Sequence, residues 1–568
     1  MRKFYFVICS AALASAIIGL MRAAVVMIDS NWLSIGDGNL LWLHWANDIG
    51  VKRMLLSVPI AILLTWFAGK FILLRIFHNA KTAIVCVCLA LLPHLVVAAA
   101  IPSSAERPTV IMITLDSVRL DHLGWGGCEL PTSPKLDSLA AAGIRFTQNI
   151  SQSSWTKPST ATLLTGLVPS KHRANSRYGP LPNSQRTLAE AFSLAGYRTN
   201  CLSSNPNITP TFGFAQGFDN MHHNVFSTAK EIVASGSEWL NAENNQASFL
   251  YLHLNDAHYP YRPSKEYAGM FNQTGVDADL TGSIELEFRH NDGETISDEQ
   301  VESLRLSYAE EIRYLDDVVG DFVSELLNTR DDVIVIITSD HGEEFLEHGD
   351  LGHGHTVYDE LIRIPLQFSV SDKIMAERYW EKGSHPQQVR QIDVLPTVLE
   401  MCGISWPTDS VSLDGHSLLP FFNSLSDKQI SRNAWSETDS EGSALSGYSG
   451  PLRSLREPGR KLIFSDPWRK ETANRVWFFN LIADPQEQKN IAENDQQQCA
   501  ELFDYCETSG WLLPHFYDSS VRVTMSNQEK AQLAAMGYTD DVEDENSEQA
   551  IYFAPSAVPW SEIKLKDD

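Results

Sequence analysis

The sequence predicts a doubly wound α/β domain, built on a largely parallel β-sheet, that follows an apolar amino-terminal part. The α/β domain is predicted by two uninterrupted β-branched runs with helical patterns between them. The amino-terminal part is distinguished by three apolar runs, which do not recur later in the chain. At 568 residues the chain is too long for one compact core, so its length indicates two to four folding units.

The three apolar runs occupy residues 4–28, 54–77 and 82–101. Each has about the 20 residues that a helix needs to cross roughly 30 Å of hydrocarbon. The alternative for the first run is a cleaved signal peptide, because Arg2 and Lys3 precede it. Two more runs follow before any folded domain, and we therefore interpret residues 1–101 as a membrane anchor of three transmembrane helices.

The basic residues between these runs predict the orientation of the anchor. Arg2 and Lys3 mark the amino terminus as cytoplasmic, and Arg75 and Lys81 mark the second turn as cytoplasmic. Three crossings then place the remainder outside the cytoplasm, after a polar linker at residues 102–108. We expect an integral membrane protein with an extracytoplasmic catalytic domain, whether periplasmic, extracellular or lumenal.

Two strands are predicted in the soluble part, at residues 110–115 and 332–338. Their unbroken apolar, β-branched character suits strands that are buried on both faces of a parallel sheet. Helical patterns alternate with them at residues 133–143, 185–196 and 301–327. This alternation is typical of doubly wound α/β domains.

Each predicted strand ends in residues that can bind a metal ion. The first ends at Asp116, and the second is followed by Ser339, Asp340 and His341. Active sites of open α/β sheets lie at the carboxyl ends of the strands, so we expect these side chains to lie together. A lone Asp at such a place is more often a helix cap, but two such places favour a metal site.

The charge of the chain limits its partners. The formal net charge of −27 makes nucleic-acid binding an unfavourable function, because an acidic surface repels phosphate backbones. An anionic substrate would need a local positive centre, and the simplest one is a bound metal ion.

From Thr156 the chain reads TKPSTATLLTG, which resembles the signature of the sulfatase family of the alkaline phosphatase superfamily. Further segments resemble other motifs of that family in the same order: 110–124, 131–146, 256–261, 339–365, 393–397, 414–418, 461–463 and 480–485. The resemblance implies an alkaline-phosphatase-like α/β fold with a smaller α+β carboxy-terminal subdomain.

We accordingly expect three parts after the anchor and linker. They are a catalytic core at residues 109–370, the rest of the core with the small subdomain at 371–495, and a tail at 496–568 that is partly disordered at 538–550.

The resemblance implies one divalent cation held by Asp116, Asp340 and His341, with Thr156 beside it as nucleophile. Carboxylate oxygens suit Mg²⁺, Ca²⁺ or Mn²⁺, and the imidazole shifts the preference toward Mn²⁺ or Zn²⁺. The cation would lower the pKa of the Thr156 hydroxyl and neutralise charge on the transferred group.

The substrate side of the site is assigned by the same resemblance. His258, His353 and His355 are candidates for binding the ester oxygens, and His258 and His355 also for protonating the leaving group. Lys157 and Arg119 are further substrate-binding candidates. For each histidine a purely structural role remains an equal alternative.

The chain departs from the family at several positions. Sulfatases convert a Cys or Ser into formylglycine, and Thr156 cannot yield that aldehyde because its β-carbon carries a methyl group. Thr160, Ser117 and His355 replace an Arg, an Asp and a Lys of the family pattern. A threonine nucleophile with one metal instead resembles the phosphoethanolamine and phosphoglycerol transferases of the superfamily, which proceed through a phosphothreonine.

The sequence therefore predicts a membrane-anchored metalloenzyme that hydrolyses or transfers a phosphate ester group of an anionic substrate, such as a lipid or a glycan, through Thr156. One alternative is a sulfuric ester hydrolase that works without formylglycine. Another is an inactive sulfatase-like binding protein, which would hold no metal.

Overall fold

The computed structural model describes residues 107–242, 246–276, 295–407, 410–423, 431–438, 451–465, 475–511 and 523–535. The expected transmembrane helices within residues 1–101 and the expected disordered stretch at 538–550 lie outside these ranges. Among the described residues, no helix combines the length and the apolar character needed to span a bilayer.

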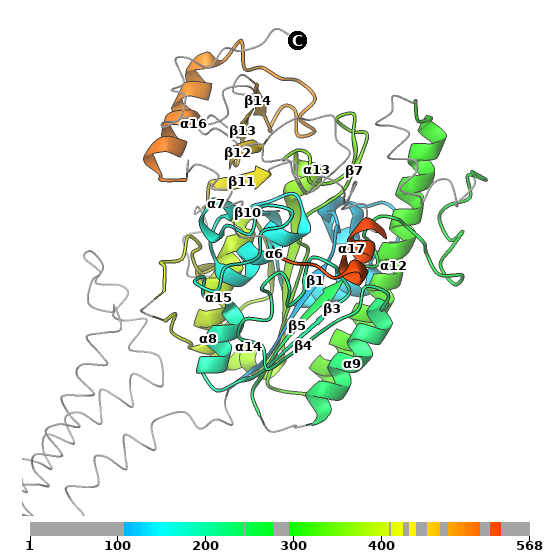
Figure 1. Ribbon diagram of the computed structural model, residues 1–568, viewed down its shortest axis with the longest axis vertical. Coiled ribbons are helices and arrows are strands. Elements are labelled where there is room, and N and C mark those ends of the chain that lie inside the picture. The colour runs from blue at the N-terminus through cyan, green and yellow to red at the C-terminus, as the bar shows by residue number, and fades with distance from the viewer. Residues whose placement is uncertain are drawn as a thin grey trace, which may run out of the picture. The chain divides into compact units, whose positions relative to one another are not determined.

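The larger part of the described chain is built on an eight-stranded sheet with the order β10-β2-β9-β6-β1-β5-β3-β4. Figure 1 labels its strands β1, β3, β4, β5 and β10. Its strands are β1 (Thr109–Leu115), β2 (Ile144–Ile150), β3 (Arg198–Ser203), β4 (Asn220–His223), β5 (Ser248–Leu254), β6 (Val333–Thr338), β9 (Arg363–Val370) and β10 (Gly383–Arg390). The three central strands β6, β1 and β5 run parallel.

The sheet is mixed, because β9 runs antiparallel to both of its neighbours, β2 and β6. A strand that runs parallel to the strand before it must be reached through a crossover of a dozen or more residues, which is usually helical. Between β6 and β9 the chain forms only the short strands β7 (Glu344–Phe345) and β8 (Leu351–Gly352) and the one-turn helix α13 (Asp359–Ile362). The other five strand pairs are parallel, so the sheet is largely parallel, as the sequence predicts, with β9 as its one antiparallel strand.

The sheet separates two apolar cores, as alternate residues of β1 show. Val110 and Met112 point into one core, and Ile111 and Ile113 point into the other. Every residue of β1 is buried, which explains why this strand reads as an unbroken apolar run.

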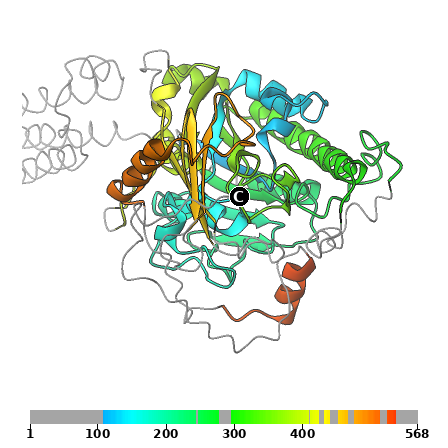
Figure 2. The same ribbon diagram turned by 90° about the horizontal axis from the view of Figure 1, so that it is seen from above.

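Helices cover both faces of the sheet (Figures 1 and 2). The first core is completed by α6 (Thr156–Thr165), α8 (Leu188–Leu194), α14 (Asp372–Arg378) and α15 (Val394–Cys402). The second is completed by α5 (Pro134–Ala142), α9 (Ala229–Ala242) and α12 (Asp298–Thr329). The short helix α7 (Pro169–His172) follows α6, and near the carboxyl end α17 (Asn527–Ala535) buries Leu533 in the first core.

A second, four-stranded antiparallel sheet forms the smaller subdomain. Its order is β11 (Ala434–Thr438), β12 (Leu452–Glu457), β13 (Arg460–Ser465) and β14 (Val476–Asn480). Helix α16 (Gln496–Thr508) packs Leu502 and Phe503 against Leu462 and Phe464 of this sheet. The core of the small subdomain therefore includes α16, which lies in the stretch 496–568 that the sequence predicts to be a tail.

Candidate active site

The candidate metal ligands lie at the carboxyl ends of two neighbouring parallel strands. Asp116 directly follows β1, and Asp340 and His341 follow β6. One ligand atom from each lies within 4.8 Å of the others, and all three residues are completely buried. Residues from two distant parts of the chain thus lie close together.

The donor set fits a divalent cation. His341 Nε2 lies 3.5 Å from Asp340 Oδ2 and 3.7 Å from Asp116 Oδ1. Oδ2 of Asp340 is buried and has no hydrogen-bond partner among the described residues. Leaving a buried carboxylate oxygen unpaired is costly, and a cation bound there removes that cost. Two carboxylates and an imidazole are ligands for Mn²⁺ or Zn²⁺ as well as for harder ions.

The two carboxyl groups have opposite electrostatic environments. Burial opposes ionisation of Asp116, but the hydrogen bond with His253 and the charges of His258, His253 and His341 outweigh it and lower its pKa. Burial and the negative charge of Asp116 raise the pKa of Asp340. The residues around Asp116 therefore stabilise its ionised form, whereas the ionised form of Asp340 would be stabilised by an added positive charge.

Three residues that the sequence analysis did not single out as part of the site hold Asp116. Asn205 Nδ2 donates a hydrogen bond of 2.6 Å to Asp116 Oδ2, and His253 Nε2 lies 2.8 Å from the same oxygen. Ser117 Oγ donates to Asp116 Oδ1 over 3.0 Å. The available signal was position, because Asn205 follows β3 and His253 interrupts the apolar pattern of β5 near its carboxyl end.

Thr156 is the first residue of α6 and is completely buried. Its Oγ1 lies 3.3 Å from His341 Nε2, so the hydroxyl borders the metal-ligating group. The amino terminus of a ten-residue helix also carries partial positive charge, which favours an anion at this position. The Thr156 hydroxyl therefore lies at the positive end of a helix and beside the residues that could hold a cation.

Hydrogen bonds fix α6 to the segment that carries the ligands. Ser159 Oγ donates to the Asp340 carbonyl oxygen over 2.6 Å, and Ser151 Oγ donates to the same oxygen over 2.7 Å. Gly342 lets this segment approach α13, because a Cβ atom there would lie 1.9 Å from the carbonyl oxygen of Glu360. The position of Thr156 relative to Asp340 is therefore set by direct bonds.

Two of the candidate histidines form a continuous group with His341. The ring centroid of His353 lies 4.3 Å from that of His341 and 4.8 Å from that of His258. Burial, followed by the charge of His258, lowers the pKa of His353 well below its usual value. His355 is completely buried, and its Nε2 lies 2.7 Å from Glu344 Oε2. His258 and His353 thus adjoin the candidate ligands, and both His353 and His355 face a carboxylate, since His353 Nδ1 lies 2.8 Å from Glu343 Oε1.

Comparison with known proteins identifies the family. The family model for sulfatases matches residues 108–404. The chain belongs to the sulfatase family.

Its curated relatives include a choline-sulfatase of Rhizobium meliloti (strain 1021), 23% identical over 74% of this chain and 90% of that protein. They also include the multifunctional alkaline phosphatase superfamily protein PehA of Trinickia caryophylli, 24% identical over 72% of this chain and 96% of that protein. The solved phosphonate monoester hydrolase of Agrobacterium radiobacter shares the fold, with a TM-score of 0.55 and 20% identity over 72% of this chain and 95% of that one.

These relationships make the protein an ester hydrolase of the alkaline phosphatase superfamily, whose sulfatase-type enzymes use a divalent metal. Its α/β fold with a mixed central sheet is consistent with the alkaline-phosphatase-like sulfatase fold.

In this member of the sulfatase family, two of the candidate substrate-binding residues bond to neighbouring residues. The Arg119 guanidinium forms ion pairs of 2.8 Å with both Asp121 and Glu347. The Lys157 ammonium donates to the carbonyl oxygen of Arg177 over 2.5 Å and lies 4.2 Å from the centroid of the Phe212 ring. These contacts give both cations a part in holding the loops around the site.

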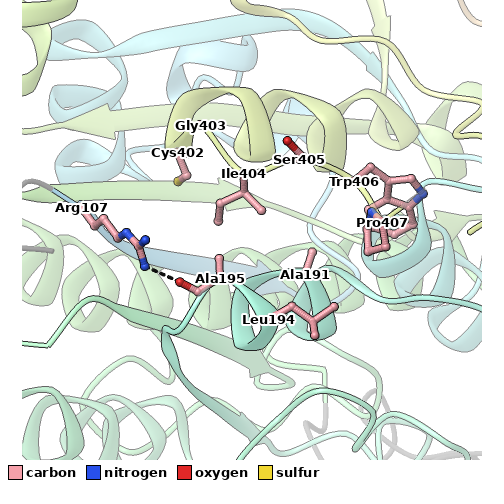
Figure 3. A pocket seen from close by; sticks show the side chains of 10 residues that line it. All are labelled: Arg107, Ala191, Leu194, Ala195, Cys402, Gly403, Ile404, Ser405, Trp406 and Pro407. Carbon is pink, nitrogen blue, oxygen red and sulfur yellow. Dashed lines mark hydrogen bonds between the residues drawn. The ribbon is translucent and has the colours of Figure 1, made fainter. Parts of the chain in front are cut away.

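The protein also has a cavity of about 410 Å³ that is lined by none of the candidate site residues (Figure 3). It lies between α8 and the segment that follows α15, with Leu194, Ile404 and Trp406 on its walls. Arg107 lines it as well and donates a hydrogen bond to the Ala195 carbonyl oxygen. The cavity is therefore separate from the metal-ligating group.

Proposed function

We propose that this sulfatase-family protein hydrolyses or transfers a phosphate ester group through Thr156, beside a divalent metal held by Asp116, Asp340 and His341. The observation that carries the proposal is the 3.3 Å separation of Thr156 Oγ1 and His341 Nε2 at the amino terminus of α6. The similarity to a phosphonate monoester hydrolase and to an alkaline phosphatase superfamily protein supports phosphoric ester chemistry.

In this proposal the Thr156 hydroxyl gives its proton to water and Oγ1 attacks the phosphorus atom, so that an Oγ1–P bond forms and the ester O–P bond breaks. The bound cation would lower the pKa of the hydroxyl and neutralise the charge of the phosphoryl group. His258 protonates the leaving oxygen, since its ring lies in the continuous histidine group, whereas His355 is bonded to Glu344. Water or an acceptor hydroxyl then releases the phosphoryl group from Thr156.

A second candidate function is sulfuric ester hydrolysis, which the family model and the choline-sulfatase relative favour. It would require a route without formylglycine, such as a metal-activated water. The retained group of Asp116, Asp340 and His341 disfavours an inactive binding protein. The substrate in either case is an anionic ester, such as that of a lipid or a glycan.

We also propose that residues 1–101 anchor the enzyme in a membrane, with the catalytic domain outside the cytoplasm. The lengths of the three apolar runs and the basic residues beside them support this arrangement. Extraction of the full chain from membranes by detergent but not by high salt or alkaline carbonate is the expected result. Release by carbonate would contradict the anchor and leave the site proposal intact.

The decisive experiment replaces the nucleophile. Thr156→Ala should lower turnover of aryl phosphates and phosphodiesters by at least about 10³-fold, because the covalent route is lost. The metal content and the unfolding temperature should stay unchanged. Thr156→Ser keeps the hydroxyl and should keep measurable activity.

Thr165→Ala is the matched control, since Thr165 is a buried threonine at the other end of the same helix and bonds only to the Ala161 carbonyl oxygen in the hydrogen bonds described. It should retain activity. Undiminished turnover by Thr156→Ala would exclude Thr156 as nucleophile, and release of sulfate without phosphate would favour the second candidate function.

A further inference from the structure

His253 lies within a chain of hydrogen-bonded side chains that leads from Thr114 through Tyr251 to Asp116, one of the candidate metal ligands. Its Nδ1 lies 2.9 Å from the Tyr251 hydroxyl, and that hydroxyl lies 3.1 Å from Thr114 Oγ1. Its Nε2 lies 2.8 Å from Asp116 Oδ2. All four residues are completely buried, so the chain has no contact with solvent.

The backbone explains how these side chains meet. Tyr251 and His253 are two residues apart in a strand, so they point to the same face of the sheet. Thr114 is paired in register with His253 on the neighbouring strand β1, and the Asp116 amide donates to the Leu254 carbonyl oxygen over 2.9 Å. The imidazole is therefore anchored at one nitrogen while the other reaches the carboxylate.

The two oxygens of Asp116 have different surroundings. Oδ2 is bound by Asn205 and His253, whereas Oδ1 accepts a hydrogen bond from Ser117 Oγ and lies 3.7 Å from His341 Nε2. A carboxylate held by two partners at one oxygen cannot rotate without breaking both bonds. Metal sites commonly use such partners of the ligands to fix ligand orientation.

We propose that His253 is a positioning residue that orients Asp116 for the metal, through the relay from Thr114 and Tyr251. This inference rests on the proposed function, because it presumes the metal. Residues that support a ligand in this way typically change metal affinity by about 10–100-fold when replaced.

His172 shows that burial of a histidine does not by itself produce this arrangement. It is also completely buried, but its Nε2 lies 3.1 Å from the Thr162 hydroxyl and 3.1 Å from the Pro158 carbonyl oxygen. Neither of these two partners is a carboxylate. His172→Gln is therefore a matched control for the loss of a buried imidazole.

The test compares His253→Gln with His172→Gln in the full chain, using Co²⁺ as the probe. Titration should show a Co²⁺ dissociation constant about 10–100-fold higher for His253→Gln than for wild type. At saturation its visible absorption bands should match those of wild type, because the ligands are unchanged. Tyr251→Phe should weaken binding in the same direction by less than tenfold.

Three results decide against the inference. Co²⁺ affinity of His253→Gln within threefold of wild type would exclude the role, and so would an equal loss in His172→Gln. Altered absorption bands at saturation would make His253 a ligand instead of a positioning residue. Absence of Co²⁺, Mn²⁺ and Zn²⁺ binding by wild type would overturn the proposed function itself, which separates the two failures.

Discussion

Two buried groups of charged residues in this protein are built on opposite principles. At the edge of the large sheet, two carboxylates meet with one oxygen of Asp340 left without a hydrogen-bond partner among the described residues. Where the small sheet meets α13, the Lys461 ammonium lies 3.0 Å from Asp359 Oδ1 and 2.8 Å from Glu487 Oε1. Arg456 adds an ion pair of 2.7 Å with Asp359.

The difference separates a functional group from a structural one. Each group contains one carboxyl group whose pKa is lowered, Asp116 or Asp359, and one whose pKa burial raises, Asp340 or Glu487. The groups differ in their cations, because Lys461 and Arg456 pair with the carboxylates of the second group only. Opposite charges are matched in the second group and unmatched in the first. A buried charge without an opposite charge is costly unless a ligand neutralises it, so the first group is suited to bind a cation. The second group, whose charges are already paired, is suited to hold the small sheet against α13.

The largest expected effect comes from removing the unmatched charge. Asp340→Asn should weaken binding of Mn²⁺ or Zn²⁺ by more than about 100-fold, beyond the range typical of residues that only support a ligand. Activity should fall with it. The metal-free protein should be at least as stable as wild type, because the buried like charges no longer repel. Calorimetric titration and thermal unfolding in a chelator measure both quantities, and a marked loss of metal-free stability would show that Asp340 is structural.

An intermediate effect is expected in the matched group. Lys461→Met leaves Glu487 without its partner and should lower the free energy of unfolding by about 3–5 kcal/mol, as removal of one member of a buried ion pair does. Metal affinity of the folded protein should change little. Lys135→Met is the control, because Lys135 forms partly exposed ion pairs with Asp317 and Asp321 and should contribute less than about 1 kcal/mol. Equal losses in the two variants, measured by denaturant unfolding, would contradict the distinction.

The smallest expected effect is a pH dependence of stability that comes from His348, which lies next to the matched group. His348 Nδ1 lies 2.5 Å from Glu360 Oε1, and although burial opposes protonation, this carboxylate outweighs it and raises the pKa of His348. A raised folded-state pKa adds stability that is fully present below the usual value of about 6.5 and is lost as the pH rises through the folded value.

His348→Gln should therefore lower stability by on the order of 1 kcal/mol at pH 5.5 and by less at pH 9. Urea unfolding of wild type and variant at both pH values measures this difference. His222→Gln serves as the control, since His222 is exposed on β4 and should show no such dependence. A loss that grows with pH would reverse the sign of the coupling.

Much of the fold was determined by local sequence. The unbroken runs predicted β1 and β6, because a strand buried on both faces has no polar alternation. The helix predicted at residues 301–327 is observed at Asp298–Thr329, and its start is set by a capping box between Ser297 and Gln300. The strand-end rule predicted that Asp116 and Asp340 lie at one edge of the sheet, because neighbouring parallel strands end there together.

Tertiary structure alone decided which side chains complete the site. His253 and Asn205 reach Asp116 from β5 and from the segment after β3, and no local pattern encodes a contact across 137 or 89 residues. The cationic groups of Arg119 and Lys157 are likewise bonded to residues of neighbouring loops, which the sequence did not indicate, and their contact with substrate stays a prediction. Periodicity reports which face of an element is buried, whereas hydrogen-bond partners depend on how the elements meet in space.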